Sequence, residues 1–334
     1  MEQFTVSSKM SDVFTADVFA PLSKYLIYSP NPYEADEDQN DPDAGTLAGL
    51  KAIGWSPEGI AAGLNFLKKT IEDCRMDQFF IYEEADCADD AFKKDVNLIR
   101  LCPEKAADTS RPAVILCAGG AYNSVCTMVE ALPTARHFVE AGFTAFLFTY
   151  RVGRIPAAQK ALDDLAAAIR YLSAHAKDIG FDPENYVIGG FSAGANLISN
   201  WGTSNNGWKH YGLAKPKAML PVYTFIDLKA EGNRDENGGI LGFMCGRNWK
   251  AEADRWNVAE HIDADYPPCY ITAGKDDATV PPVNSEKMAE ALRSLGIPVI
   301  LDEGEHAPHG FGDGTGTDVE GWPERAIDFI MNLC

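Results

Sequence analysis

From about residue 95 onward, short apolar runs alternate with amphipathic helical patterns. The clearest helical pattern covers residues 157–176, in which apolar residues recur at steps of three and four: Leu162, Leu165, Ile169 and Leu172. Further helices are predicted over residues 57–73, 132–140 and 284–295. Strands are predicted over residues 96–102, 113–117, 143–150, 186–189, 269–273 and 299–302. Strands separated by helices indicate βαβ units, so the chain is predicted to be an α/β protein with a mostly parallel central sheet flanked by helices.

The first 90 residues differ in character and are predicted to be a partly helical N-terminal extension. Gly54 ends a helix-like stretch over residues 46–53, and Ser56-Pro57 has the form of an N-cap followed by proline at the first helical position. The run at residues 31–43, NPYEADEDQNDPD, is acidic with two prolines and is predicted to be a solvated loop. We therefore divide the chain into residues 1–90 and an α/β domain over residues 91–334.

Composition and charge limit the kind of partner. The 334 residues are 46% apolar and 23% charged, which is typical of a globular protein with a self-supporting core. Lys and Arg number 29 and Asp and Glu 49, so the net charge is 29 − 49 = −20. Such a surface repels phosphate backbones and anionic lipids, which argues against nucleic-acid and membrane-surface roles. No apolar run approaches the roughly 20 residues that span a bilayer, and no signal peptide is visible at the N-terminus.

Cysteine and histidine usage argues against disulfide and metal chemistry. The eight cysteines include no C-x-x-C pair, and several lie in apolar strand-like runs, which is typical of reduced, buried thiols and favours the cytoplasm. The six histidines show no spacing typical of metal ligands. Phosphate-binding and dinucleotide-binding glycine motifs are also missing from strand-to-helix settings. The sequence therefore predicts neither a metal nor a cofactor.

One serine lies in the setting of a nucleophile, at the centre of GFSAG between a predicted strand and a helical segment. A sharp strand-to-helix turn leaves no room for side chains two residues before and after the serine, which explains Gly190 and Gly194. The turn lifts the hydroxyl of Ser192 above the sheet edge, at the positive end of the next helix. The alternative is a plain turn of small residues, but the flanking strand and helix favour the nucleophile.

A serine nucleophile needs a base, and the base needs an orienting acid. In this kind of sheet the chain order is serine, then an acid, then histidine. The loop after the fifth predicted strand carries Asp276 and Asp277, and the loop after the sixth carries His306 and His309. We favour Asp277, which lies midway along its loop, and His309, which precedes glycines that permit close approach of the backbone. Asp276 and His306 stay open as alternatives.

The tetrahedral intermediate of acyl transfer needs backbone N–H donors for its oxyanion. One donor is expected from Ala193, the residue after the nucleophile. The other is expected from the glycine turn after an early strand, in the run AVILCAGGAYNS, at Gly120 or Ala121. A Gly-Gly pair by itself is most often merely a turn. Tyr122, which follows this turn, is assigned to substrate binding.

At this point the sequence resembles the α/β-hydrolase superfamily, and more narrowly the bacterial esterases that include acetyl-xylan and feruloyl esterase-like enzymes. The resemblance covers about residues 95–334 and rests on AGGAY (118–122), YRV (150–152), GFSAGANL (190–197), GKDDATVP (274–281) and HGFG (309–312). AGGAY departs from the usual motif by carrying Ala118 and Ala121, and backbone donors survive an alanine. The resemblance implies an α/β-hydrolase fold, no cofactor, and a short acyl ester as substrate, such as an acetyl group on a plant-derived carbohydrate.

Residues 202–265 are rich in aromatic side chains and are predicted to be a small cap-like insertion. These aromatics either line an acyl or sugar pocket or form the core under the insertion. They are Trp208, Tyr211, Tyr223, Phe225, Phe243, Trp249 and Trp256.

The residues together predict a serine carboxylic-ester hydrolase that acts on a small-molecule ester through an acyl-serine. Two alternatives stay open: the same residues could cleave peptide or amide bonds, or the chain could be a non-catalytic binding protein on the same fold. The oligomeric state, including a homo-oligomer, is not determined by the sequence.

Overall fold

The computed structural model describes residues 3–30, 45–105, 111–229 and 239–333. The acidic run at residues 31–43 lies outside the described residues, and so does Cys334. The seven cysteines that are described are all unpaired. In the part of the chain that the structure describes, no helix is both long and apolar enough to cross a membrane.

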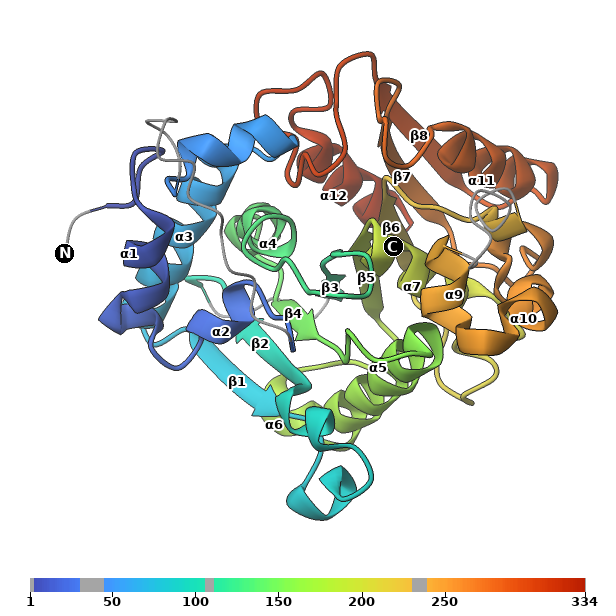
Figure 1. Cartoon of the computed structure of the whole chain (residues 1–334), viewed down its shortest axis with the longest axis horizontal. Coiled ribbons are helices and arrows are strands. Elements are labelled where there is room, and N and C mark those ends of the chain that lie inside the picture. Colours follow the sequence, from blue (N-terminus) through green and yellow to red (C-terminus); the bar gives the residue numbers. More distant parts are fainter. Residues whose placement is uncertain (1–2, 31–44, 106–110, 230–238, 334) are drawn as a thin grey trace.

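One eight-stranded sheet forms the centre of the fold (Figure 1). Its strands are β1 (Met76–Phe80), β2 (Asn97–Leu101), β3 (Ala113–Cys117), β4 (Ala145–Thr149), β5 (Tyr186–Phe191), β6 (Ala218–Val222), β7 (Cys269–Gly274) and β8 (Val299–Gly304). Their order across the sheet is β1-β2-β4-β3-β5-β6-β7-β8. The pairs from β4 through β8 are parallel, whereas β1 and β2 run antiparallel to their neighbours. The predicted mostly parallel sheet flanked by helices is confirmed.

Helices cover both faces of the sheet. The α-helices are α1 (Met10–Thr15), α2 (Ser23–Leu26), α3 (Pro57–Glu72), α4 (Ala131–Glu140), α5 (Ala157–Ala174), α6 (Ala176–Ile179), α7 (Ala193–Gly202), α9 (Gly239–Cys245), α10 (Trp249–Trp256), α11 (Val283–Ser294) and α12 (Trp322–Asn332). Short 3-10 helices are η1 (Asp17–Phe19), η2 (Ala48–Ile53), η3 (Glu84–Cys87), η4 (Ala91–Asp95), η5 (Gly246–Asn248) and η6 (Val258–Glu260). Parallel crossovers are right-handed, so the direction of each step across the sheet decides which face its helix covers. The step from β3 to β4 places α4 on one face. The steps from β4 to β5 and from β5 to β6 run in the opposite direction across the sheet and place α5 and α7 on the other face. The helix contacts agree, since α4 packs against α12 and α5 against α7.

The direction of strand addition reverses at β3, which lies between β4 and β5. In open parallel sheets, ligands bind beyond the carboxyl ends of the strands at such a reversal. The turn after β3 and the turn after β5 therefore meet at the position where a site is expected. These turns begin with Ala118 and with Ser192.

Strands β1 and β6 and helix α12 are not predicted from the sequence. Strand β6 contains Pro221, and proline normally argues against a central strand because it cannot donate to the ladder. Since β6 lies between β5 and β7, the predicted insertion over residues 202–265 is interrupted by a central strand. Similarly, β1 pairs with β2, so the predicted boundary at residue 90 falls between two adjacent strands of one sheet.

The aromatic residues of the predicted insertion pack into the protein. Tyr223, Phe225 and Trp256 are buried in the core. The other four are partly buried and pack against it: Trp208, Tyr211, Phe243 and Trp249. This burial favours the core interpretation over a pocket lining for the first three side chains.

The N-terminal segment packs closely onto the α/β domain. Ser56 caps α3 by accepting the Gly59 N–H at 3.2 Å, and Pro57 occupies the first helical position, as the sequence predicts. A Cβ atom on Gly63 would lie 3.1 Å from the Pro133 nitrogen at the start of α4. Glycine therefore allows α3 to approach α4 backbone to backbone, and Figure 1 shows α3 beside α4.

Candidate active site

Ser192 occupies a strained turn between β5 and α7. Its backbone angles are φ 51° and ψ −115°, a conformation that is costly for a residue with a side chain. A Cβ atom on Gly190 would lie 2.4 Å from the Gly194 oxygen, and one on Gly194 would lie 2.0 Å from the Cys117 oxygen. Both positions therefore require glycine, for the steric reason expected from the GFSAG motif.

The structure brings Ser192, His309 and Asp277 into one hydrogen-bonded chain. The Nε2 atom of His309 lies 2.9 Å from the Ser192 Oγ, and its Nδ1 atom lies 2.7 Å from the Asp277 Oδ2. The side chain of Asp277 is 2% exposed and that of His309 19% exposed. The histidine can thus accept the serine proton at one ring nitrogen while the buried carboxylate holds the other.

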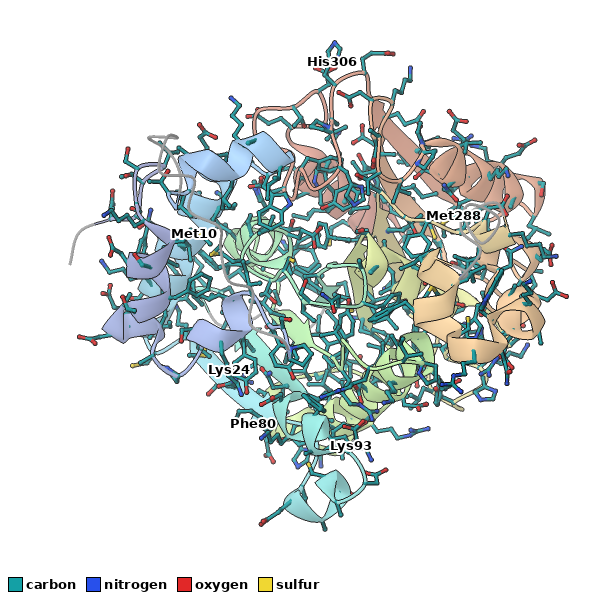
Figure 2. The ribbon with its side chains drawn as sticks, in the orientation of Figure 1. Met10, Lys24, Phe80, Lys93, Met288 and His306 are labelled. Atoms are coloured by element: carbon teal, nitrogen blue, oxygen red, sulfur yellow. The ribbon has the colours of Figure 1, made fainter. Side chains whose placement is uncertain are left out.

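The two alternatives from the sequence take other places. Asp276 accepts the backbone N–H of Ala307 at 2.8 Å, so its carboxylate caps the loop after β8. The side chain of His306 is 83% exposed, and Figure 2 shows it projecting outward at the periphery of the molecule. By contrast, the second oxygen of Asp277 accepts the N–H groups of Thr279 and Val280, both at 2.8 Å. The geometry favours Asp277 and His309.

The turn after β3 lies against the serine. A Cβ atom on Gly119 would lie 2.8 Å from the Cβ atom of Ser192. Gly120, Ala121 and Tyr122 follow with positive φ angles of 128°, 53° and 57°. Successive backbone N–H groups of a turn can point into one concavity, where an anion binds.

Three backbone donors are available at this position. Among the described residues, the N–H groups of Gly120, Ala121 and Ala193 donate to no protein acceptor. Ala193 is the first residue of α7, whose helix dipole favours negative charge. The arrangement offers donors for the oxyanion of an acyl-transfer intermediate.

Comparison with known proteins places this fold and site in a family. The family model described as BD-FAE matches residues 99–292, more than half of the chain. The chain belongs to the BD-FAE family. The matched range includes Ser192 and Asp277 and ends before His309.

Known proteins similar to this BD-FAE chain include xylan-related and ester-cleaving enzymes. An endo-1,4-beta-xylanase B from Butyrivibrio fibrisolvens is 25% identical over 57% of the chain and 31% of its own length. A probable carboxylic ester hydrolase, LipM, from Mycobacterium tuberculosis is 24% identical over 63% of the chain and 51% of its own length. The chain thus spans about a third of the length of the first of these curated relatives and about half of the second. The propionate-bound structure of a thermophilic esterase from Thermogutta terrifontis is 26% identical, with a TM-score of 0.63, and the match covers 78% of this chain and 96% of that one.

Tyr122, which the sequence assigns to substrate binding, makes its contacts within the protein. Its side chain is buried, and its hydroxyl donates to the Asn196 Oδ1 at 2.9 Å. Asn196 in turn donates to the Phe225 carbonyl oxygen at 2.8 Å. In this BD-FAE protein the Tyr122 side chain therefore anchors the turn after β3 onto α7, and its role in substrate binding stays a prediction.

Two further residues near the site have no motif in the sequence. Glu130 is buried below the turn after β3, and Tyr223 follows β6 with its ring centroid 4.7 Å from that of His309. The only signal for Glu130 is a lone acidic residue between the apolar residues Val129 and Ala131. Tyr223 is one aromatic residue among many in its segment, so the sequence does not distinguish it.

The N-terminal segment reaches both loops that flank Ser192. Tyr28 and Val125 exchange two backbone hydrogen bonds, at 3.0 and 2.8 Å, next to the turn after β3. On the other side, a Cβ atom on Gly310 would lie 2.6 Å from the Trp55 ring. Residues that precede the family match therefore contact the turn after β3 and the loop that carries His309.

An ion pair fixes the loop that carries His309. Asp313, four residues further along, is buried, and its Oδ2 lies 3.2 Å from the Nε2 of His137 on α4. The other ring nitrogen of His137 bonds to Glu324, and Arg136 lies beside the pair. Burial lowers the pKa of His137, but the hydrogen bonds to Asp313 and Glu324 outweigh burial and raise it above its ordinary value. Burial raises the pKa of Asp313, but the hydrogen bond with His137, the charge of His137 and the hydrogen bonds from Thr315 together outweigh burial and lower it.

These directions predict a pH-dependent contribution to stability. The raised pKa of His137 means that the pair stabilises the fold fully below about pH 6.5, and that this contribution is lost as the pH rises through the folded-state pKa. Because the pKa of Asp313 is lowered, the contribution of its carboxylate to stability is lost only below about pH 4. His137→Gln is expected to reduce the free energy of unfolding by about 1–3 kcal/mol at pH 6, and by less at pH 9. Urea denaturation at both pH values measures this, and a loss of equal size at both would contradict it.

Metal ligation finds no support in the geometry. Across the described ranges, no group of three or more His, Cys, Asp or Glu side chains is arranged to hold a metal ion.

Proposed function

We propose that the protein is a serine carboxylic-ester hydrolase. The observation that carries this proposal is the chain of hydrogen bonds from Asp277 through His309 to Ser192, next to backbone donors that have no acceptor among the described residues. A nucleophile, a base, an orienting acid and an oxyanion site are the parts that acyl transfer requires. Membership of the BD-FAE family supports the same reaction class.

The geometry assigns a role to each group in the acylation half of the reaction. The Oγ of Ser192 attacks the ester carbonyl carbon while the Nε2 of His309 accepts the hydroxyl proton. The carbonyl oxygen becomes an oxyanion, which the N–H of Ala193 and that of Gly120 or Ala121 bind. Asp277 holds the imidazole and stabilises its charged form. Collapse of the intermediate breaks the bond to the alcohol oxygen, which takes the proton from His309 and leaves.

Deacylation repeats these steps with water as the nucleophile. His309 removes a proton from water as the water oxygen attacks the acyl carbon, and the same donors bind the second oxyanion. When this intermediate collapses, the proton returns from His309 to the Oγ of Ser192. The products are the free alcohol and the carboxylic acid, and the serine is regenerated.

The substrate we propose is a short acyl ester, with an acetylated carbohydrate as the class to test first. The similar Thermogutta terrifontis esterase is described with propionate bound, which supports a short acyl group. The similarity to a xylanase from Butyrivibrio fibrisolvens supports a carbohydrate on the alcohol side.

Hydrolysis of p-nitrophenyl acetate, butyrate and octanoate tests this proposal. We expect kcat/KM to fall along the series, by about tenfold or more in total, because each methylene that a pocket cannot accommodate costs binding energy in the transition state. An acetylated xylo-oligosaccharide is expected to release acetate, whereas the deacetylated oligosaccharide serves as the blank. Faster cleavage of aminoacyl-p-nitroanilides than of the aryl esters would favour a peptidase. Binding of esters without turnover would favour a non-catalytic protein.

A further inference from the structure

One buried carboxyl group beside the site takes no part in the chain of hydrogen bonds from Asp277 to Ser192. Glu130 precedes α4 and is only 4% exposed. A buried carboxylate without partners is costly, so the partners of Glu130 show what it holds in place. Its Oε2 accepts the backbone N–H of Gly119 at 2.5 Å, and its Oε1 accepts the hydroxyl of Tyr223 at 2.9 Å.

The first contact fixes the turn that supplies the oxyanion donors. The N–H of Gly119 is held by Glu130, and the carbonyl of Gly119 accepts the N–H of Cys126 at 2.9 Å. This carbonyl and the N–H of Gly120 belong to the same planar peptide group, so fixing the carbonyl also fixes the direction of that N–H. A Cβ atom on Gly119 would lie 3.2 Å from the Glu130 Oε2, tighter than an ordinary contact. Glycine thus permits the carboxylate to approach, and the carboxylate sets the orientation of the turn.

The second contact reaches the side of the site that holds the base. The ring centroid of Tyr223 lies 4.7 Å from that of His309, with the two rings tilted by 55°. Tyr223 also has a φ angle of 38°, a backbone conformation that residues other than glycine rarely adopt. The hydroxyl bond to Glu130 fixes the ring against which the imidazole packs.

We propose that Glu130 is a positioning residue, which holds the oxyanion turn and the neighbour of the imidazole in one arrangement. The proposal rests on the proposed ester hydrolase function. Glu130 touches neither of the reacting groups, so it acts through Gly119 and Tyr223. Both of its oxygens accept hydrogen bonds from these donors. Burial raises the pKa of Glu130 above its ordinary value, and the hydrogen bonds from the Gly119 N–H and the Tyr223 hydroxyl offset only part of that effect.

Two substitutions separate positioning from folding. Glu130→Ala removes both contacts, and we expect kcat/KM for p-nitrophenyl acetate to fall by about 10²-fold, mainly in kcat, because misplaced donors stabilise the transition state less. Glu130→Gln keeps an acceptor for Gly119, and its amide can donate to the Tyr223 oxygen. Activity is therefore expected to recover in large part. Thermal unfolding of each variant gives the folded fraction, to which all rates are normalised.

Transition-state binding supplies a readout that a merely structural role would not move. An aliphatic trifluoromethyl ketone adds to Ser192 and forms an oxyanion at the proposed donors. We expect its inhibition constant for the folded Glu130→Ala variant to rise in parallel with the loss of kcat/KM, while KM changes little. Asp302→Asn is the matched control, because Asp302 also accepts a tyrosine hydroxyl, that of Tyr270 at 2.6 Å, but lies on β8. This variant is expected to bind the ketone as the unmodified protein does.

The outcomes distinguish the two proposals. If Glu130→Ala keeps wild-type kcat/KM and ketone affinity once both are normalised to its folded fraction, the positioning role is wrong while the esterase proposal stands. If the unmodified protein neither cleaves esters nor reacts at Ser192 with a fluorophosphonate, the esterase proposal fails and the positioning role fails with it. A parallel loss of kcat and ketone affinity in folded Glu130→Ala, with recovery in Glu130→Gln, supports both.

Discussion

Ser192→Ala is expected to lower kcat/KM for p-nitrophenyl acetate by about 10⁴-fold or more, leaving only the rate that the oxyanion donors and substrate binding supply. The Oγ of Ser192 lies 2.9 Å from the Nε2 of His309, so its removal takes away the nucleophile and leaves the base without its proton donor. The substitution deletes one oxygen atom and should leave the strained turn intact. Steady-state hydrolysis measures the effect, and labelling by a fluorophosphonate should disappear in the same variant.

Ser173→Ala is the matched control for this substitution. The hydroxyl of Ser173 donates to the Ile169 carbonyl oxygen within α5 and is not part of the proposed site. It is expected to retain wild-type turnover and full labelling. Near wild-type turnover in Ser192→Ala would show that the proposed mechanism is wrong.

Asp277→Asn is expected to lower kcat by about 10⁴-fold, as loss of the correct imidazole tautomer does in serine hydrolases. One oxygen of Asp277 accepts the N–H groups of Thr279 and Val280, so the asparagine carbonyl is held there and its NH₂ group faces the Nδ1 of His309. The Nδ1 atom must then accept a hydrogen bond from the asparagine NH₂ group. The ring proton is therefore on Nε2, the nitrogen that faces the Ser192 Oγ. The imidazole can no longer take the serine proton. Comparison of kcat values on a saturating short ester measures this loss.

Asp276→Asn makes the same chemical change one residue earlier. Asp276 accepts the Ala307 N–H at the surface of the loop, a bond that an asparagine oxygen can also accept. We expect little change in kcat for this variant. Losses of equal size in Asp276→Asn and Asp277→Asn would contradict the assignment of Asp277 as the orienting acid.

The parts of the site that the sequence predicted are those that depend on local chain geometry. Gly190 and Gly194 are needed because of contacts within one tight turn and with the adjacent strand, so the motif alone indicates a nucleophile position. The alternation of strands and helices similarly predicts the sheet, because burial imposes its periodicity on each segment separately. Strand β6 was missed because Pro221 contradicts the local rule, and β1 because its burial pattern is irregular.

The remaining parts depend on contacts between distant segments. Asp276 and Asp277 are equivalent in a sequence pattern, and only the packing of the loops after β7 and β8 decides which carboxylate faces His309. Glu130 and Tyr223 are 93 residues apart, and nothing local to either residue reports their contact.

The sequence by itself therefore determined the α/β class of this protein and the turn that presents its serine, since steric limits and hydrophobic periodicity act within short stretches of chain. Only the tertiary structure decided which acid orients the imidazole, that Tyr122 is buried, and that the N-terminal segment supports the loops beside Ser192. The physical reason is that side-chain direction, burial and hydrogen-bond partners at these positions are set by strand order and by packing across the sheet edge. These long-range contacts leave no periodic signal along the chain.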